Sequence, residues 1–174
     1  MKNLIRNILC TLYFVPLYIY FVPLCITLAG CEGTTFQSSV PAYPVRVVID
    51  TRVFVNFKPE HFGSYITVNR DGYFENDKFV MPVNAMDAYG YGGVVVYVGM
   101  FGYTAYDLAC PYCAAKGKKS PCVVDGMYAE CLQCEEKYDL GGGYALPQNG
   151  LSKEALRKLR IINTDGKLTI TQGQ

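Results

Sequence analysis

The chain has 174 residues, of which 51% are hydrophobic and 18% charged, and its formal net charge is +1. All 15 acidic residues and all but two of the 16 basic residues lie after residue 31, so this larger part of the chain is close to neutral. A near-neutral chain has no basic field to attract nucleic acid. Gly141 to Gly143 are not followed by the Gly-Lys-Ser/Thr of a phosphate-binding loop, so we predict no nucleotide site either.

The N-terminus reads as an export signal. Lys2 and Arg6 are followed by an apolar run with no charged residue until Glu32. A short basic region before an apolar core is typical of a secretion signal. The alternative is a transmembrane anchor, because the run is about long enough to span a bilayer. Pro16 and Pro23 interrupt the run and argue against the anchor.

The end of the apolar run, "LAGC" (residues 28–31), resembles the lipobox of bacterial lipoproteins. In that family the signal is cut before the cysteine, which is then acylated. The resemblance implies a protein of the bacterial cell envelope, on its periplasmic or surface side, anchored to the membrane by a lipid on Cys31. Residues 1–30 would be the signal peptide, residues 31–44 a lipidated tether, and residues 45–174 the folded domain.

After the tether, the chain shows short apolar runs separated by turn signals. Residues 45–57, "VRVVIDTRVFVNF", alternate with a period of two and predict one long strand with a buried face. Residues 64–68 and 78–83 predict short strands, with a turn at 69–72 after the first of them.

Three hairpins follow, over residues 92–110, over residues 123–131 with a turn at Asp125-Gly126, and over residues 159–171 with a turn near Asp165-Gly166. Only residues 151–159 predict a helix, which Ser152 would cap. Many short strands with glycine turns predict an all-β fold, an antiparallel sandwich or barrel.

Five cysteines remain for the domain if Cys10 and Cys25 leave with the signal and Cys31 carries lipid. Four of them form two C-x-x-C pairs, Cys110 with Cys113 and Cys131 with Cys134. Two such turns facing each other make a tetrahedral sulfur site, and thiolates favour zinc, iron and iron–sulfur clusters. We therefore predict these four cysteines as the ligands of a metal ion or cluster.

Disulfides are the alternative, because cysteines outside the cytosol usually pair. Disulfides between the two loops would link them covalently, and a disulfide within one C-x-x-C would make a redox motif. The thioredoxin-like redox motif needs a βαβ context, and no long helix is predicted after Cys113. The fifth cysteine, Cys122, is the odd one in any scheme. Its neighbours "KKSPC" predict an exposed loop, in which it would be a free thiol or a partner in a disulfide isomer.

From about Gly92 onward the order of elements resembles a Rieske domain. An alternating run leads to "CPYC", which resembles the C-P-H loop of the family, and a second strand pair leads to "CLQC", where the family has C-P-x-H. Next come "KYDL", a glycine and proline loop (141–151) and a closing hairpin. The resemblance implies a Rieske-like antiparallel β sandwich with a small ligand-loop subdomain spanning about 108–147.

The ligand types depart from that family, because a Rieske centre uses two cysteines and two histidines. Cys110 and Cys131 match the cysteines of the family, Cys134 stands where a histidine would be, and Tyr112 stands where the other would be, with Cys113 next to it. We therefore expect a [2Fe–2S] cluster or a single Fe or Zn ion on four cysteines. With a cluster or iron, the resemblance implies electron transfer to a redox partner in the envelope.

The other polar residues give no sign of an enzyme. Three lysines between the ligand loops (Lys116, Lys118, Lys119) and three glutamates around the second loop (Glu130, Glu135, Glu136) are expected to be solvated surface charges. The only histidine, His61, is expected in a surface loop, and no Ser–His–Asp set is present. The alternative function is therefore a structural or binding module, in which the cysteines hold zinc or form two disulfides.

Overall fold

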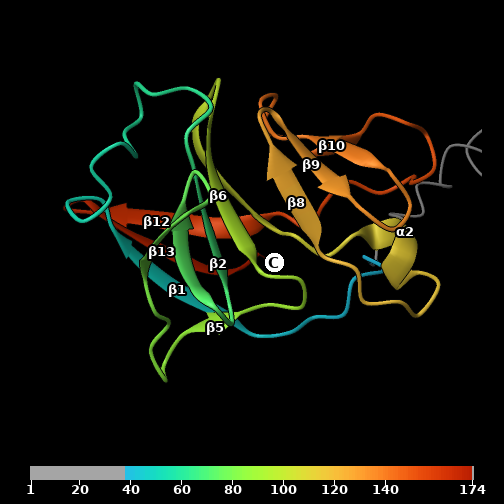
Figure 1. Ribbon diagram of the computed structural model, residues 1–174, viewed down its shortest axis with the longest axis horizontal. Coiled ribbons are helices and arrows are strands. Elements are labelled where there is room, and N and C mark those ends of the chain that lie inside the picture. Colours follow the sequence, from blue (N-terminus) through green and yellow to red (C-terminus); the bar gives the residue numbers. More distant parts are fainter. Residues whose placement is uncertain (1–37, 174) are drawn as a thin grey trace, which may run out of the picture. The chain divides into compact units, whose positions relative to one another are not determined.

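A computed structural model describes residues 38–173 (Figure 1). The predicted signal peptide, the predicted acylation site Cys31 and most of the predicted tether lie outside the described residues. Among the residues that are described, none of the helices has the length and hydrophobicity needed to cross a membrane.

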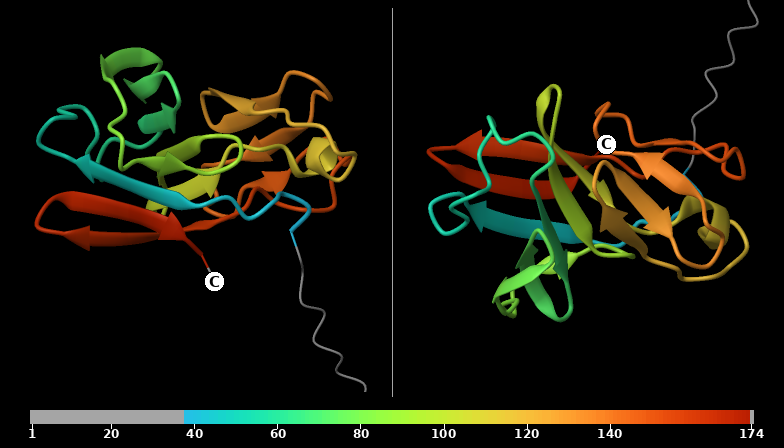
Figure 2. Two further views of the ribbon diagram at one scale, coloured as in Figure 1. Left: turned by 90° about the horizontal axis from the view of Figure 1, so that it is seen from below. Right: turned by 45° about the horizontal axis from the view of Figure 1, so that its top comes forward.

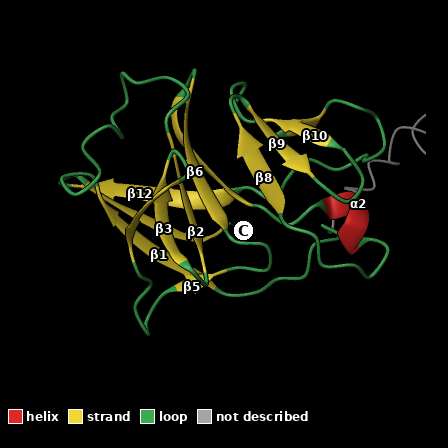
Figure 3. Ribbon diagram, in the orientation of Figure 1, coloured by secondary structure: helices red, strands yellow, loops and turns green. Residues whose placement is uncertain are grey.

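Within this range the chain is built almost entirely of strands, joined by turns and loops. The strands are β1 (Val45–Asp50), β2 (Tyr65–Asn69), β3 (Gly72–Glu75), β4 (Lys78–Met81), β5 (Ala88–Tyr89), β6 (Val94–Gly99), β7 (Gly102–Asp107), β8 (Cys122–Asp125), β9 (Tyr128–Cys131), β10 (Lys137–Asp139), β11 (Leu146–Pro147), β12 (Leu159–Thr164) and β13 (Lys167–Gln172). The short helix α2 spans Pro111–Ala114. The predicted all-β class is confirmed (Figure 3).

The strands form three antiparallel sheets. One sheet has the order β12-β13-β1-β5, a second has the order β4-β3-β2-β6-β7, and the third has the order β11-β10-β9-β8. Every pairing between neighbours is antiparallel. All three predicted hairpins are present, and the turn after β2 joins Asn69 to Gly72 as the sequence predicts.

The first two sheets share a core of aliphatic and aromatic side chains. Their inward faces contribute Val47 and Ile49 from β1, Ile66 and Val68 from β2, and Val94, Val96 and Val98 from β6, all fully buried. Alternation along each strand sends these residues to one face; on β1 their neighbours Arg46 and Val48 are exposed, whereas on β6 Val95 and Tyr97 are buried against a second core. The two sheets therefore form the sandwich that the hydrophobic pattern predicts.

The third sheet has a core of its own, which holds the cysteines. Figure 1 shows β8, β9 and β10 beside the sandwich, with α2 at the lower end of these strands, and Figure 2 shows the same grouping from two other directions. Tyr97 and Tyr106 of the sandwich pack with Ala129 and Tyr138 of the third sheet in one buried cluster. All five cysteines of the domain contribute to this second core or pack against it.

Two predicted elements differ from the structure. The strand predicted over 45–57 ends at Asp50, whose carbonyl accepts a hydrogen bond from the Val53 amide in a turn. The turn ends the alternation, so that Val53 and Val55 are exposed and Phe54 is fully buried, against the prediction, while Phe57 is buried as predicted.

The helix predicted over 151–159 is an irregular loop that leads into β12. Ser152 does not cap a helix; its hydroxyl bonds with the backbone of Glu154 instead. The amide of Leu156 donates to the carbonyl of Ala145, a long-range bond that replaces a helical one. Tertiary partners for the backbone therefore override the local helical pattern.

Candidate metal centre

The first ligand loop is shaped by proline. Cys110 is extended, with φ −67° and ψ 116°, and Pro111 follows at the first position of α2. Proline favours an extended residue before it and has the φ of a helix, so this pair sets the sharp entry into the helix. The amide of Ala114 donates to the carbonyl of Cys110, which closes the single turn that brings Cys113 back beside Cys110.

The second ligand loop is a tight turn at the end of β9. The amide of Glu135 donates to the carbonyl of Cys131 over 2.7 Å, and the amide of Cys131 donates to the carbonyl of Glu136 over 2.9 Å. Glu135 has a positive φ of 60°, the left-handed conformation that reverses the chain. This turn places the side chains of Cys131 and Cys134 on the same side.

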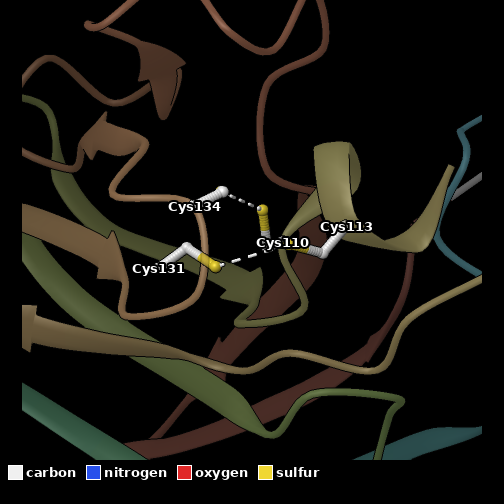
Figure 4. A group of neighbouring side chains, drawn as sticks. All are labelled: Cys110, Cys113, Cys131 and Cys134. Carbon is white, nitrogen blue, oxygen red and sulfur yellow. Dashed lines mark hydrogen bonds between the residues drawn. The ribbon is translucent and has the colours of Figure 1, made fainter. Parts of the chain in front are cut away.

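The two loops face each other, and their four thiols meet in one group (Figure 4). All four Sγ atoms lie within 4.8 Å of one another. The Sγ atoms of Cys110 and Cys134 are 3.6 Å apart, and those of Cys113 and Cys131 are 3.7 Å apart. The edge of a tetrahedron with metal–sulfur bonds of about 2.3 Å is about 3.8 Å. The four sulfurs are therefore spaced to surround one metal ion.

The group is enclosed on most sides. Cys110, Cys113 and Cys131 are buried, while Cys134 is only partly buried. Leu132 and Gln133, at the tip of the second loop, are exposed. The group therefore lies just below the surface, and Cys134 is its contact with solvent.

The protonation of the thiols reflects their crowding. The neighbouring thiol of Cys122 lowers the pKa of Cys110, against the opposing effect of burial, and the Tyr138 hydroxyl lowers it further. Burial raises the pKa of Cys113 and of Cys134. Four thiolates repel one another in such a site unless a cation neutralises them, and a bound metal ion deprotonates the thiols that coordinate it.

Two hydroxyl groups reach the sulfurs from outside the C-x-x-C motifs. The Tyr138 oxygen lies 3.4 Å from the Cys110 sulfur, and the Ser120 oxygen lies 3.2 Å from the Cys131 sulfur. Both residues are buried. Hydroxyl donors of this kind orient thiolate ligands and stabilise their negative charge. Spacing within the motifs does not reveal either residue, although Tyr138 belongs to the "KYDL" segment of the family resemblance.

The side chain of Asp107 stabilises the backbone that leads into the first ligand loop. Its Oδ1 accepts hydrogen bonds from the amides of Gly92 and Ala109, and its Oδ2 accepts one from Tyr91. The side chain is 1% exposed. A buried carboxylate satisfied by three amides fixes the backbone directly before Cys110.

The side chain of Glu136 stabilises the second ligand loop. The expectation that it lies on the surface is wrong. Its side chain is fully buried and accepts four backbone amides: Gln148, Asn149, Leu151 and Ser152. Burial alone raises the pKa of a carboxyl group, but these amides outweigh it and lower the pKa of Glu136. The carboxylate therefore ties the loop 148–152 to the residue two positions after Cys134.

The remaining charges around the site are placed as expected or nearly so. Lys116 is exposed, with its nitrogen 3.7 Å from the ring centroid of Tyr112. Glu130 forms a partly exposed ion pair with Lys137 over 3.1 Å. Glu135 and His61 are exposed. None of these side chains enters the sulfur group.

Cys122, by contrast, is not in an exposed loop. It begins β8, is 4% exposed and pairs with Cys131 across the sheet. The nearby thiol of Cys110, with burial, raises the pKa of Cys122. The domain therefore has a fifth thiol beside the four that face one another.

Comparison with known proteins finds few similarities. No family model matches the chain, and no curated protein sequence matches it. Two chains of solved structures match. One belongs to a structure described as "Complex of reduced oxygenase and oxidized ferredoxin in carbazole 1,9a-dioxygenase"; the match has 13% sequence identity and a TM-score of 0.43, and covers 75% of this chain and 95% of that chain. A likeness this distant carries no conclusion about function.

Proposed function

We propose that Cys110, Cys113, Cys131 and Cys134 bind one metal ion, and that with iron this centre transfers single electrons. The observation that carries the proposal is the spacing of the four sulfurs, all within 4.8 Å of one another. Four cysteine thiolates are a usual ligand set for zinc, and soft thiolates also suit iron. Iron in such a site is a one-electron centre.

The spacing favours a single ion over a [2Fe–2S] cluster. A binuclear cluster holds its four thiolates as two pairs on different irons. Sulfurs on opposite irons are then separated by the metal–metal distance in addition to the two bonds, which exceeds the edge of one tetrahedron. Here no two of the four sulfurs are more than 4.8 Å apart. A cluster would require the two ligand loops to move apart.

The surroundings of the sulfurs suit an electron carrier. The hydroxyls of Tyr138 and Ser120 contact two of the sulfurs, and hydrogen bonds to sulfur are among the groups that set the potential of such centres. Cys134 and the exposed tip at Leu132 give the centre a short route to the surface. The order of elements that resembles a Rieske domain supports the same role, as a carrier and not an enzyme.

A structural zinc site is the second candidate, because zinc prefers this same tetrahedral set of four thiolates. In that case the ion would fix the two loops, and the protein would act through another surface. Two disulfides fit less well, since the Cys110 and Cys134 sulfurs are 3.6 Å apart, the Cys113 and Cys131 sulfurs are 3.7 Å apart, and a disulfide bond is about 2.05 Å long.

The place of action that we propose follows from the N-terminal sequence. The "LAGC" motif supports a lipid anchor on Cys31, and hence a protein held at the bacterial envelope membrane. A redox partner would then be another envelope protein, docking near Leu132.

Metal and sulfide analysis of the full chain tests the proposal. The chain would be purified anaerobically in detergent from cells supplied with iron, and its absorption spectrum recorded before and after dithionite. One iron per chain without acid-labile sulfide, with visible bands that bleach, is the expected result. Two irons with two sulfides would mean a [2Fe–2S] cluster.

The other outcomes separate the alternatives. One zinc and no reducible chromophore would mean a structural site. No metal, with the four thiols blocked from alkylation, would mean disulfides. Substituting Cys113→Ser should abolish metal binding, whereas Lys118→Ser, in the exposed loop between the two ligand pairs, should leave it unchanged.

A further inference from the structure

The fifth thiol occupies a position that the four-sulfur group does not explain. Cys122 is buried, with only 4% of its surface exposed, and packs in the same core as the four ligands. It begins β8, directly opposite the ligand Cys131 in the register of the β8–β9 hairpin. A free thiol beside other thiols is a reactive arrangement, because two sulfurs that can meet form a disulfide when an oxidant accepts two electrons.

The strand register selects one partner for Cys122. In the β8–β9 hairpin, Cys122 lies directly opposite Cys131. The amide of Cys122 donates to Leu108 and the amide of Cys131 donates to Glu136, so neither amide is used between these two residues. They therefore form a non-hydrogen-bonded pair, in which the Cα atoms are about 4.5 Å apart and the side chains are closest. This separation lies within the range that disulfides span, about 4.4–6.8 Å.

Cys110 is a poorer partner for a bond. The strand around it pairs Ala109 with Pro121, and the Cys110 amide donates to Ser120. Cys122 is therefore diagonal to Cys110 and not opposite it. The Cα atoms of diagonal neighbours in a sheet are about 7–8 Å apart, which is more than a disulfide spans. Geometry favours the bond between Cys122 and Cys131.

A small oxidant has a route to this pair. A cleft of about 630 Å³ lies between the end of the β2–β3 hairpin and β8, and Pro121, Cys122 and Val123 form part of its lining. The four sulfurs do not line it. Of the five cysteines in the described residues, Cys122 is the one that lines this cleft.

We propose that Cys122 is a site of reversible oxidation, at which a peroxide drives a cross-strand disulfide with Cys131 and thereby releases the metal ion. The release step rests on the function proposed above. The bond from Cys131 to the metal breaks, and a sulfur–sulfur bond forms between Cys131 and Cys122. Two electrons pass to hydrogen peroxide, which takes the Cys122 proton and one proton from solvent and leaves as two waters. A dithiol reductant reverses the reaction.

Loss of one ligand explains the release. The ion would retain only Cys110, Cys113 and Cys134, and a closed four-thiolate site would become an incomplete one. The hydroxyl of Ser120, which contacts the Cys131 sulfur, would lose its thiolate partner in the same step. Oxidation would therefore change the site from metal-holding to metal-free without unfolding the sandwich.

The test uses the full chain loaded with Zn²⁺, so that the sulfurs and not the ion are oxidised. Hydrogen peroxide is added, released zinc is followed with a colorimetric chelator, and disulfides are mapped by mass spectrometry of peptides. We expect a Cys122–Cys131 cross-link to appear at the rate of zinc release, and a dithiol to restore zinc binding. Cys122→Ser and Cys122→Ala should each release zinc at least tenfold more slowly.

Equal release rates in the wild type and in both variants would overturn the inference, as would cross-links that join other cysteines. Circular dichroism of the two variants shows whether they keep the fold, and either one suffices if the other does not. A chain that binds no metal at all would sink the proposed function instead. Disulfide mapping of that metal-free chain still decides the pairing, because a Cys122–Cys131 peptide supports it and its absence overturns it.

Discussion

Gly92 and Ala109 lie so close together that a Cβ atom added to Gly92 would be 2.1 Å from the backbone nitrogen of Ala109. The obstacle is backbone and cannot move aside as a flexible side chain would. Ala109 directly precedes Cys110, so this contact sets where the first ligand loop begins. The absence of a side chain at Gly92 is therefore a condition for the metal site and not only for a turn.

Gly92→Ala should destabilise the domain and weaken the site. Overpacking of a well-packed region costs about 1–3 kcal/mol, and we expect the upper end because backbone must shift. Chemical denaturation measures the stability, and competition with a chelator measures the metal affinity. Both should fall.

Gly126→Ala is the matched control, because nothing lies within 4 Å of its added Cβ. It carries only the penalty of a left-handed conformation, about 1–2 kcal/mol, at a φ of 58°. Its metal affinity should be unchanged. Equal loss of affinity in the two variants would contradict the role of the Gly92 contact.

Asp107→Asn should also act on the first loop. The carboxylate accepts the amides of Tyr91, Gly92 and Ala109, and an amide side chain of the same shape offers one acceptor oxygen in place of two. At least one buried amide is left without a partner, so we expect a loss of about 2–3 kcal/mol in the free energy of unfolding. Asp71→Asn removes an exposed carboxylate and should change the free energy of unfolding by less than about 0.5 kcal/mol. A loss as small for Asp107→Asn would refute the bracing role.

The sequence predicted the features that depend on neighbouring residues. The turns at Gly126 and at Asp165-Gly166 carry their own conformational signal, and the C-x-x-C spacing describes a short loop whatever surrounds it. These predictions hold because the residues that decide them lie within a few positions of one another. The meeting of the two cysteine pairs was predictable for a similar reason, since a single hairpin, formed by strands β8 and β9, connects them.

Features decided by distant backbone groups escaped prediction. Glu136 looks like one of several surface acids, and only the fold brings the amides of residues 148–152 onto it. The helix predicted at 151–159 fails for the same reason, because the amide of Leu156 donates to the distant carbonyl of Ala145. Lysines before Cys122 indicate a loop, which is correct for them, but the strand begins at the cysteine itself.

Glu136→Gln tests whether the buried carboxylate holds the loop 148–152 in place. The new side-chain amide would point its own hydrogens at two of the backbone amides that now donate to the carboxylate, which costs both bonds and adds repulsion. We expect a loss of about 3 kcal/mol in the free energy of unfolding. Hydrogen exchange at Leu151 and Ser152 should accelerate more than elsewhere.

Glu135→Gln provides the comparison, because the neighbouring glutamate is exposed and makes no side-chain hydrogen bond among residues 38–173. It should leave stability and exchange nearly unchanged. If both variants behave alike, the buried carboxylate does not hold the loop.

Tyr138→Phe should lower the reduction potential of the iron-loaded protein. The hydroxyl lies 3.4 Å from the Cys110 sulfur, and a donor to a thiolate stabilises the more negative, reduced state. Its loss should lower the potential by an amount on the order of tens of millivolts, measured by a spectroscopic redox titration.

Tyr97→Phe is the control for a buried hydroxyl. Within the described residues the Tyr97 oxygen has no hydrogen-bond partner, so it makes no hydrogen bond to any of the sulfurs. The potential should therefore stay at the wild-type value. A potential that falls equally in both variants would assign the effect to general packing and not to the hydrogen bond.

Removing the ion should loosen the ligand loops and leave the sandwich intact. Helix α2 has four residues, too few to persist without outside support, and its buried residues are Pro111 and the ligand Cys113. The sandwich core contains none of the cysteines. After chelation, hydrogen exchange should accelerate at Ala114 and Glu135, whose amides close the two ligand turns, while β6 keeps its protection. Loss of protection across β6 as well would mean that the ion stabilises the whole domain, and unchanged exchange at the two turns would mean that the loops hold their shape without it.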